Sequence, residues 1–138
     1  MQKFSLLHLP PYHFAYPLDG LKEVIKDQPI NSIPKAPTYI KGLLPMRGHL
    51  YTIFSLPTLL EFRVSETPLS YTILLHHPKE RFGFQVESID IIEAPQMVHL
   101  SPSSISFAHW TKGVFMSTYG ETFILNFAPL FHTKNRSL

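Results

Sequence analysis

Short apolar and aromatic runs recur along the chain and are separated by proline, glycine and charged residues. These runs are rich in aromatic and β-branched side chains, which is typical of β-strands. The pattern predicts strands at residues 4–9, 12–18, 41–46, 49–56, 70–77, 80–87, 111–118 and 121–127. Turn residues join neighbouring runs and predict β-hairpins at Pro10-Pro11, Arg47-Gly48 and Tyr119-Gly120.

Other segments show a different pattern. Apolar residues at helical spacing predict one or two helical turns at residues 18–25, and an equivalent helix is expected at residues 88–94. Pro57 suits the first turn of a further short helix. Three prolines within residues 29–38 exclude a helix interior or a central strand, so this segment is expected to be an extended connector.

The second half of the chain repeats the first. Residues 5–18 align with residues 73–86 at an offset of 68, and residues 39–60 align with residues 110–131 at an offset of 71. Identical residues occupy equivalent positions at Leu6/Leu74, Leu7/Leu75, His8/His76, Pro10/Pro78, Phe14/Phe82, Lys41/Lys112, Gly42/Gly113, Ile53/Ile124 and Leu59/Leu130. The repeat predicts two similar modules that share one core. Each has the size of a small β-barrel, and a surface between two such modules can accept a partner.

Composition narrows the choice of function. The chain has 138 residues, 44% of them hydrophobic, so we expect one folded domain with a substantial core. It has no cysteine, which excludes disulfides and thiol chemistry. The net charge is only +2 and the basic residues are scattered, which argues against nucleic acid as the partner. No apolar run is long enough to span a membrane, so we expect a soluble, cytoplasmic protein without membrane insertion.

The side chains that could carry chemistry form no recognisable constellation. His76 and His77 are neighbours in a predicted strand and should point to opposite faces, so we expect neither a metal nor another cofactor. Asp90 and Glu93 lie three residues apart on the expected helix, where a solvated face explains them better than acid–base catalysis. The serines at positions 101, 103, 104 and 106 lack a nucleophile-elbow motif and are assigned to a connector. We therefore expect no enzyme activity.

Several short motifs follow one another in a fixed order. They are L-x-E-V at residues 21–24, I-P-x-x-P at 33–37, Y-I-K-G-L at 39–43, R-G at 47–48, R-F-G-F-x-V-E-S-I at 81–89, and K-G-V then Y-G-E-T-F-I-L-N within 112–126. In this order and spacing they resemble the CheW-like chemotaxis coupling proteins over residues 4–131. The resemblance implies a mainly β fold of two small five-stranded SH3-like β-barrels that share a hydrophobic core, with short helices. The expected subdomains are residues 10–75 and 76–131, with a strand at 4–9 that can be exchanged between the barrels.

The resemblance also implies a function and a site. Proteins of this family are adaptors that couple the cytoplasmic tips of chemoreceptors to the regulatory domain of a CheA-type histidine kinase, in chemotaxis or a related motility pathway. Carried onto this chain, the receptor-facing groove contains Leu21, Glu23, Gly42 and Arg47. The chain departs from the family pattern in having P-M-R-G at residues 45–48 and Ser55 where an aspartate is usual, with Asn126 at the equivalent place in the second half.

The residues themselves add two structural expectations. An arginine before a hairpin glycine projects from a rigid support and can pair with a carboxylate, so we expect a Glu23–Arg47 ion pair or shared polar patch; the alternative is two separate solvated charges. Gly42 and Gly113 lie inside apolar strands, where glycine marks a bulge or a close approach of two backbones, although such a kink could also shape a groove.

One rival function stays open on the sequence. Small β-barrels also bind single-stranded nucleic acid through exposed aromatic rings. Tyr12, Tyr51, Tyr71 and Tyr119 would serve this purpose if they lined a sheet face beside lysines. The absence of a basic stripe counts against this alternative.

Overall fold

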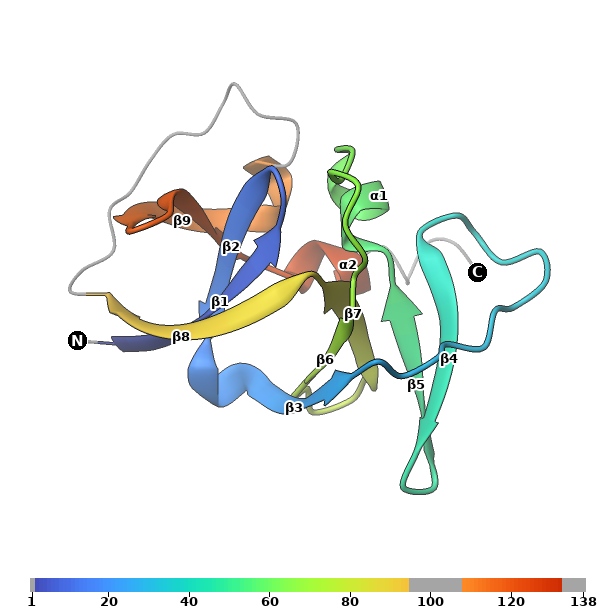
Figure 1. Ribbon diagram of the computed structural model, residues 1–138. Helices are drawn as coiled ribbons and strands as arrows, with labels where there is room; N and C mark the ends of the chain where they lie inside the picture. The colour runs from blue at the N-terminus through green and yellow to red at the C-terminus, as the bar shows by residue number, and fades with distance from the viewer. Residues whose placement is uncertain (1, 95–107, 133–138) are drawn as a thin grey trace.

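Two five-stranded sheets make up most of the computed structural model, which describes residues 2–94 and 108–132 (Figure 1). We call the sheet with order β8-β1-β2-β10-β9 the first sheet and the sheet with order β3-β6-β7-β5-β4 the second sheet. The first sheet contains β1 (Gln2–Leu9), β2 (Tyr12–Pro17), β8 (Ser88–Ala94), β9 (Thr111–Ser117) and β10 (Gly120–Leu125). The second sheet contains β3 (Leu21–Lys26), β4 (Ile40–Met46), β5 (His49–Phe54), β6 (Tyr71–Leu75) and β7 (Phe82–Val86).

The two sheets have the same internal arrangement. When β1 to β5 are matched with β6 to β10, the strand order of one sheet becomes the order of the other. Each sheet also contains one parallel pair, β2 with β10 and β5 with β7, while the remaining pairs are antiparallel. This pseudo-symmetry confirms that the repeat in the sequence encodes two similar β modules.

The first two strands of each half join the sheet that holds the last three strands of the other half. Figure 1 shows β3, in blue, leaving β1 and β2 for the second sheet, and β8, in yellow, returning to lie against β1. As a result, residues 21–86 hold the whole second sheet, and the first sheet is assembled from both flanking segments. The boundaries expected from the sequence, 10–75 and 76–131, do not coincide with this division.

Both segments expected to be helical at residues 18–25 and 88–94 are strands, so these predictions were wrong. Only Leu18–Gly20 forms a 3-10 turn (η1); β3 follows it and pairs with β6. β8 pairs with β1 along its length, from Gln2 opposite Ala94 to His8 opposite Ser88. Hydrogen bonding to a neighbouring strand outweighs local helical spacing in segments this short.

The strand assignment of β8 also changes the reading of its two acids. Successive side chains of a strand alternate between faces, so Asp90 and Glu93 lie on opposite faces of β8. The expected shared acidic face therefore does not exist.

The hairpins and helix α1 agree with the sequence. Tight turns join β1 to β2, β4 to β5 and β9 to β10, as predicted. Helix α1 (Leu56–Leu60) begins with Pro57 in its first turn, and Ser55 caps it. A second short helix, α2 (Ala128–His132), follows β10. A further 3-10 turn, η2 (Ala108–Trp110), precedes β9. The connector at 29–38 contains no strand apart from an isolated bridge at Asn31.

Three hydrophobic clusters hold the sheets together. The central cluster lies between the sheets and takes residues from both, among them Phe14 and Phe123 from the first and Phe82 and Phe84 from the second. Helices α1 and α2 contribute leucines to it, and α2 lies at the junction of the sheets in Figure 1. This cluster confirms the expected shared core.

Each sheet also curls around a smaller core of its own. The first-sheet core contains Phe4, Ala15, Ala94, Phe115 and Ile124, and the second-sheet core contains Leu44, Tyr51, Ile53 and Leu74. The sheets are barrel-like but not closed, because within the described residues the edge strands of each sheet do not pair with each other.

Candidate partner-binding site

Glu23 and Arg47 form an ion pair, as the sequence predicted. Arg47 lies in the β4–β5 turn with a φ of 51°, next to Gly48 with a φ of 80°, so the turn uses the left-handed conformations that Gly48 supplies without strain. Its guanidinium donates a hydrogen bond from Nη1 to Oε1 of Glu23 in β3. The Arg47 side chain is 68% exposed, so part of the guanidinium remains open to another molecule.

The pair joins the two edges of the second sheet. β3 and β4 are at opposite ends of the strand order, so a contact between Glu23 and the β4–β5 turn requires the sheet to curl back on itself. The hydrogen bond from Arg47 lowers the pKa of Glu23 and keeps its carboxylate ionised. The second sheet is thus closed at this end by side chains instead of backbone hydrogen bonds.

Gly42 allows the connector to pair with β4, an edge strand of the same sheet. Asn31, in the connector, forms a two-way backbone bridge with Leu43 of β4, at 2.9 and 2.8 Å. A Cβ atom at Gly42 would lie 2.2 Å from the carbonyl oxygen of Asn31, which is far too close. The expectation of a close backbone approach at Gly42 is therefore confirmed.

The structure gathers only part of the site implied by the family resemblance. Leu21 and Glu23 lie two residues apart on β3, and a bulge shifts the register between them. Leu21 packs against the central cluster. Gly42 precedes Arg47 by five residues of β4 and its turn, which corresponds to about 16 Å along an extended chain. Glu23 and Arg47 are in contact, whereas Gly42 lies in β4 away from this pair.

A polar hollow borders β3 beside the ion pair. It is lined by Lys22, Tyr51, Leu75, His76, His77, Pro78, Lys79, Glu80 and Arg81. The ammonium of Lys22 lies 5.8 Å from the centre of the Tyr51 ring. Nδ1 of His77 accepts hydrogen bonds from the amides of Lys79 and Glu80, which fixes the conformation of the β6–β7 loop. Three cationic residues and one acidic residue line this hollow, so it carries a positive excess that sequence analysis did not single out.

The first sheet has its own polar closure at the equivalent place. The hydroxyl of Tyr119, in the β9–β10 turn, donates a 3.3 Å hydrogen bond to Oδ2 of Asp90 in β8. β8 and β9 are the two edge strands of the first sheet, as β3 and β4 are of the second. The same contact between a hairpin turn and the opposite edge strand therefore occurs twice, once with Arg47 and once with Tyr119.

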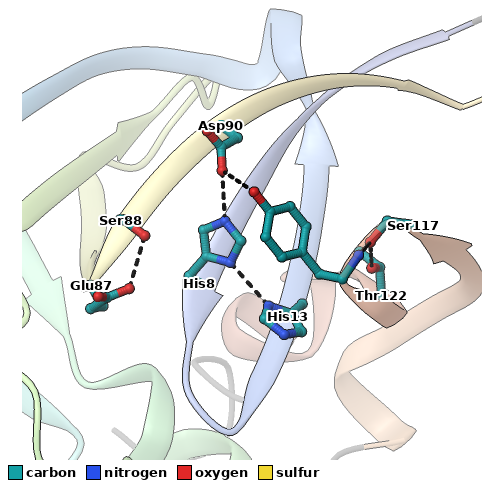
Figure 2. A network of polar contacts seen from close by, with 8 residues as sticks. His8, His13, Glu87, Ser88, Asp90, Ser117 and Thr122 are labelled. Atoms are coloured by element: carbon teal, nitrogen blue, oxygen red, sulfur yellow. Dashed lines mark hydrogen bonds and ion pairs between the residues drawn. The ribbon is translucent and has the colours of Figure 1, made fainter.

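Two histidines extend the closure of the first sheet. Figure 2 shows His8 between Asp90 and His13. Nε2 of His8 is 2.9 Å from Oδ2 of Asp90, and the Nδ1 atoms of His8 and His13 are 3.0 Å apart. We call His8, His13, Asp90 and Tyr119 the His8 network. The sequence alone does not predict this network. Its only trace in the sequence is that His8 recurs as His76 in the second repeat, whereas the four residues meet only because their strands pair in the fold.

The other residues singled out from the sequence do not form a site. Within residues 2–94 and 108–132, no three histidine, aspartate or glutamate side chains are arranged to hold a metal ion. Serines 101, 103, 104 and 106 lie outside the described residues. No helix in the described part of the chain has both the length and the apolar character needed to cross a bilayer.

The four tyrosines of the rival nucleic-acid reading do not share an exposed face. Tyr51 is buried in the second-sheet core, and Tyr12 and Tyr71 pack against the central cluster. Tyr119 is exposed but belongs to the His8 network. Although Lys22 and Lys26 approach Tyr51 and Tyr71, these rings do not form a row on which bases could stack.

The comparisons with known proteins agree with this architecture. The crystal structure of the scaffolding protein TtCheW from Thermoanaerobacter tengcongensis superposes with a TM-score of 0.84 over 99% of this chain and 97% of that chain, at 18% sequence identity. No curated protein sequence matches the chain significantly. The family model described as the CheW-like domain matches residues 3–133. The chain belongs to the CheW-like domain family.

Proposed function

We propose that this protein is a non-enzymatic adaptor that couples chemoreceptors to a CheA-type histidine kinase. Membership of the CheW-like family and the two-module fold support a scaffold role in chemotaxis or a related motility pathway. The observation that carries the proposal is the Glu23–Arg47 pair, which presents a charged, largely exposed guanidinium from a rigid turn. Leu21, Glu23, Gly42 and Arg47 are proposed as the receptor-facing surface.

The mechanism of such an adaptor is geometric. Two modules joined by one shared core cannot move far relative to each other, so partners bound to different surfaces are held at a fixed orientation. A change in one partner can then alter the activity of the other without chemistry in the adaptor. Individual contacts of this kind are modest, and assembly at several sites strengthens them.

The cationic hollow next to β3 adds a chemical preference to this surface. Lys22 adjoins Glu23 in the chain, and Lys79 and Arg81 line the same hollow. A receptor segment that carries carboxylates would complement these residues and could also accept a hydrogen bond from Arg47. The kinase regulatory domain is proposed to bind a different face, so that both partners are held together.

Co-sedimentation with the organism's CheA-type kinase and a receptor signalling fragment tests the proposal. The adaptor should appear in a ternary complex, and Arg47→Glu should weaken receptor binding at least about tenfold, which corresponds to ~1.4 kcal/mol. Arg63→Glu, at another exposed arginine, serves as the matched control and should bind normally. Absence of binding to both partners, with the protein folded, would contradict the adaptor function.

A charge swap separates recognition from support of the turn. Glu23→Arg combined with Arg47→Glu restores an ion pair in the opposite orientation. If Arg47 itself contacts the receptor, the double variant stays defective; if the pair only holds the turn in place, the double variant recovers binding. Recovery would remove Arg47 from the proposed contact surface.

A further inference from the structure

The His8 network lies on the first sheet, and none of its members belongs to the proposed receptor surface on the second sheet. His8 is almost fully buried, and its side chain is 7% exposed. Its imidazole is held on both sides, by Asp90 at Nε2 and by His13 at Nδ1. The ring of Tyr119 covers the pair, with centroid distances of 4.7 Å to His8 and 5.4 Å to His13.

These contacts determine where the protons are in the neutral pair. An ionised carboxylate can only accept, so Nε2 of His8 must carry the hydrogen that points to Asp90. Nδ1 of neutral His8 then has a lone pair, and Nδ1 of His13 must donate to it. Each histidine is therefore fixed in one tautomer by its neighbours.

The network can hold one extra proton without rearrangement. The extra proton can bind Nε2 of His13 while Nδ1 of His13 still donates to His8. It can instead reside on His8, whose Nδ1 then donates to Nδ1 of His13. In both arrangements one hydrogen lies between the two Nδ1 atoms. A second added proton would place a hydrogen on each of these atoms at a separation of 3.0 Å, with no acceptor and with two like charges together. This doubly protonated state is incompatible with the contact between the two rings.

The surrounding groups make the first extra proton easier to bind than the second. Facing His8 are His13 from β2, Asp90 from β8 and Tyr119 from the β9–β10 turn. Glu87, which precedes β8, donates its amide to the carbonyl oxygen of His8, while its carboxylate accepts from the Ser88 hydroxyl. The negative charge of Asp90 favours the uptake of the first proton by the two histidines. Burial, and then the proximity of His8, lower the pKa of His13 from its usual value.

We propose that the His8 network is a two-step proton switch in the first sheet: it retains a first proton in the closed arrangement, and a second proton separates His13 and Tyr119 from His8. The contact between His8 and Asp90 survives both steps, because protonated His8 still donates to the carboxylate. The Glu23–Arg47 pair closes the second sheet without a histidine, so that closure does not depend on a histidine proton.

The consequence for stability has a definite sign. Because the pKa of His13 is lowered in the folded protein, the unfolded chain binds this proton more readily. The contribution of His13 to stability is therefore present above the usual histidine pKa and declines as the pH falls from there toward the lowered value. Local opening of the network should precede global acid unfolding in this pH range.

Nuclear magnetic resonance of the full chain between pH 8 and pH 4 tests the switch. The ring-nitrogen signals of the histidine pair should change in two separate steps as the pH falls. Nuclear Overhauser contacts between Tyr119 and the two imidazoles should persist through the first step and disappear at the second. Amide signals of the second sheet should stay dispersed throughout, which would show that the opening is local.

A glutamine at position 13 gives the decisive variant. In His13→Gln the amide can donate to or accept from His8, so only one titration step should remain and the Tyr119–His8 contact should persist at low pH. His77→Gln, at a histidine on the second module, is the control and should leave both steps unchanged. A single common step with all ring contacts retained, or loss of the second-sheet signals at the same pH as the Tyr119 contact, would overturn the proposal. The wild-type titration alone decides the matter if His13→Gln does not fold.

Discussion

At the scale of single residues, Gly42 shows how a missing side chain shapes this fold. The carbonyl of Asn31 occupies the space that a Cβ at position 42 would need, and the bridge to Leu43 depends on that approach. Gly42→Ala is therefore expected to break the bridge or displace β4, at a cost of about 1–3 kcal/mol. Thermal or denaturant unfolding measures the loss. Gly48→Asn is the control, since space is open around Gly48 and asparagine tolerates its positive φ; equal destabilisation by both variants would contradict the role of Gly42.

Gln85 is buried with a hydrogen bond at only one end of its side-chain amide. Its Nε2 donates to the hydroxyl of Thr72, but its Oε1 is buried without a hydrogen-bond partner in the described residues. Replacing the pair by apolar groups of similar shape, in Thr72→Val with Gln85→Met, removes this orphaned acceptor. The double variant should unfold at equal or higher denaturant concentration, with a gain of up to about 1–3 kcal/mol. Thr72→Val alone should be less stable than the double variant, and the opposite ranking would show that Oε1 is satisfied in solution.

At the scale of elements, β3 and β8 explain why the sequence predicted helices where strands are found. Both strands place a charged residue on the side that faces a polar closure, Glu23 toward Arg47 and Asp90 toward His8. Both also expose an apolar residue, Val24 at 41% and Ile91 at 64%. These inversions disturb the alternation that marks a strand, and the remaining apolar residues then match helical spacing. The hairpins carried clear turn signals in the sequence and were predicted correctly.

The candidate site was predictable to the extent that it depends on local chemistry. Arg47 beside Gly48 indicated a projecting guanidinium, and Glu23 was the carboxylate expected to meet it. The His8 network could not be predicted from local sequence, because His8 and Asp90 are separated by 82 positions in the chain. The exchange of β1 and β2 for β6 and β7 between the sheets leaves no trace in residue periodicity.

Helix α1 illustrates how a departure from the family pattern is accommodated. Ser55 accepts a hydrogen bond from the amide of Thr58 at 3.4 Å, a long and weak cap. In the second module Asn126 accepts from the amide of Ala128 at 3.1 Å, so both short helices are preceded by a capping side chain. Ser55→Ala is expected to destabilise the protein by about 0.5–2 kcal/mol, and Ser55→Asp to match or exceed the wild type. Denaturation midpoints rank the three proteins, and a more stable alanine variant would contradict the capping role.

At the scale of the whole molecule, two modules depend on one interior. Apolar side chains from both sheets and both helices meet in the central cluster, whereas the core inside each curled sheet is small. The first sheet also needs segments from both ends of the chain, while the second occupies the uninterrupted stretch 21–86. Neither module can bury its larger apolar face alone, so the protein should unfold as one cooperative unit.

Phe14 provides the test of this cooperativity. It belongs to the first sheet, is fully buried, and its ring lies 5.8 Å from that of Phe62, which follows α1 in the second module. Phe14→Ala removes a large side chain from the shared interior and should cost about 3–5 kcal/mol, a large part of the ~5–15 kcal/mol that stabilises a typical domain. Hydrogen exchange should then accelerate by a similar factor in the core strands of both sheets, and calorimetry should show a single transition at a lower temperature. Met116→Ala, at a side chain that is 71% exposed, should leave both unchanged. If Phe14→Ala instead loosened only the first sheet or split the transition in two, the sheets would be independent domains, and a rigid relation between two bound partners would need another explanation.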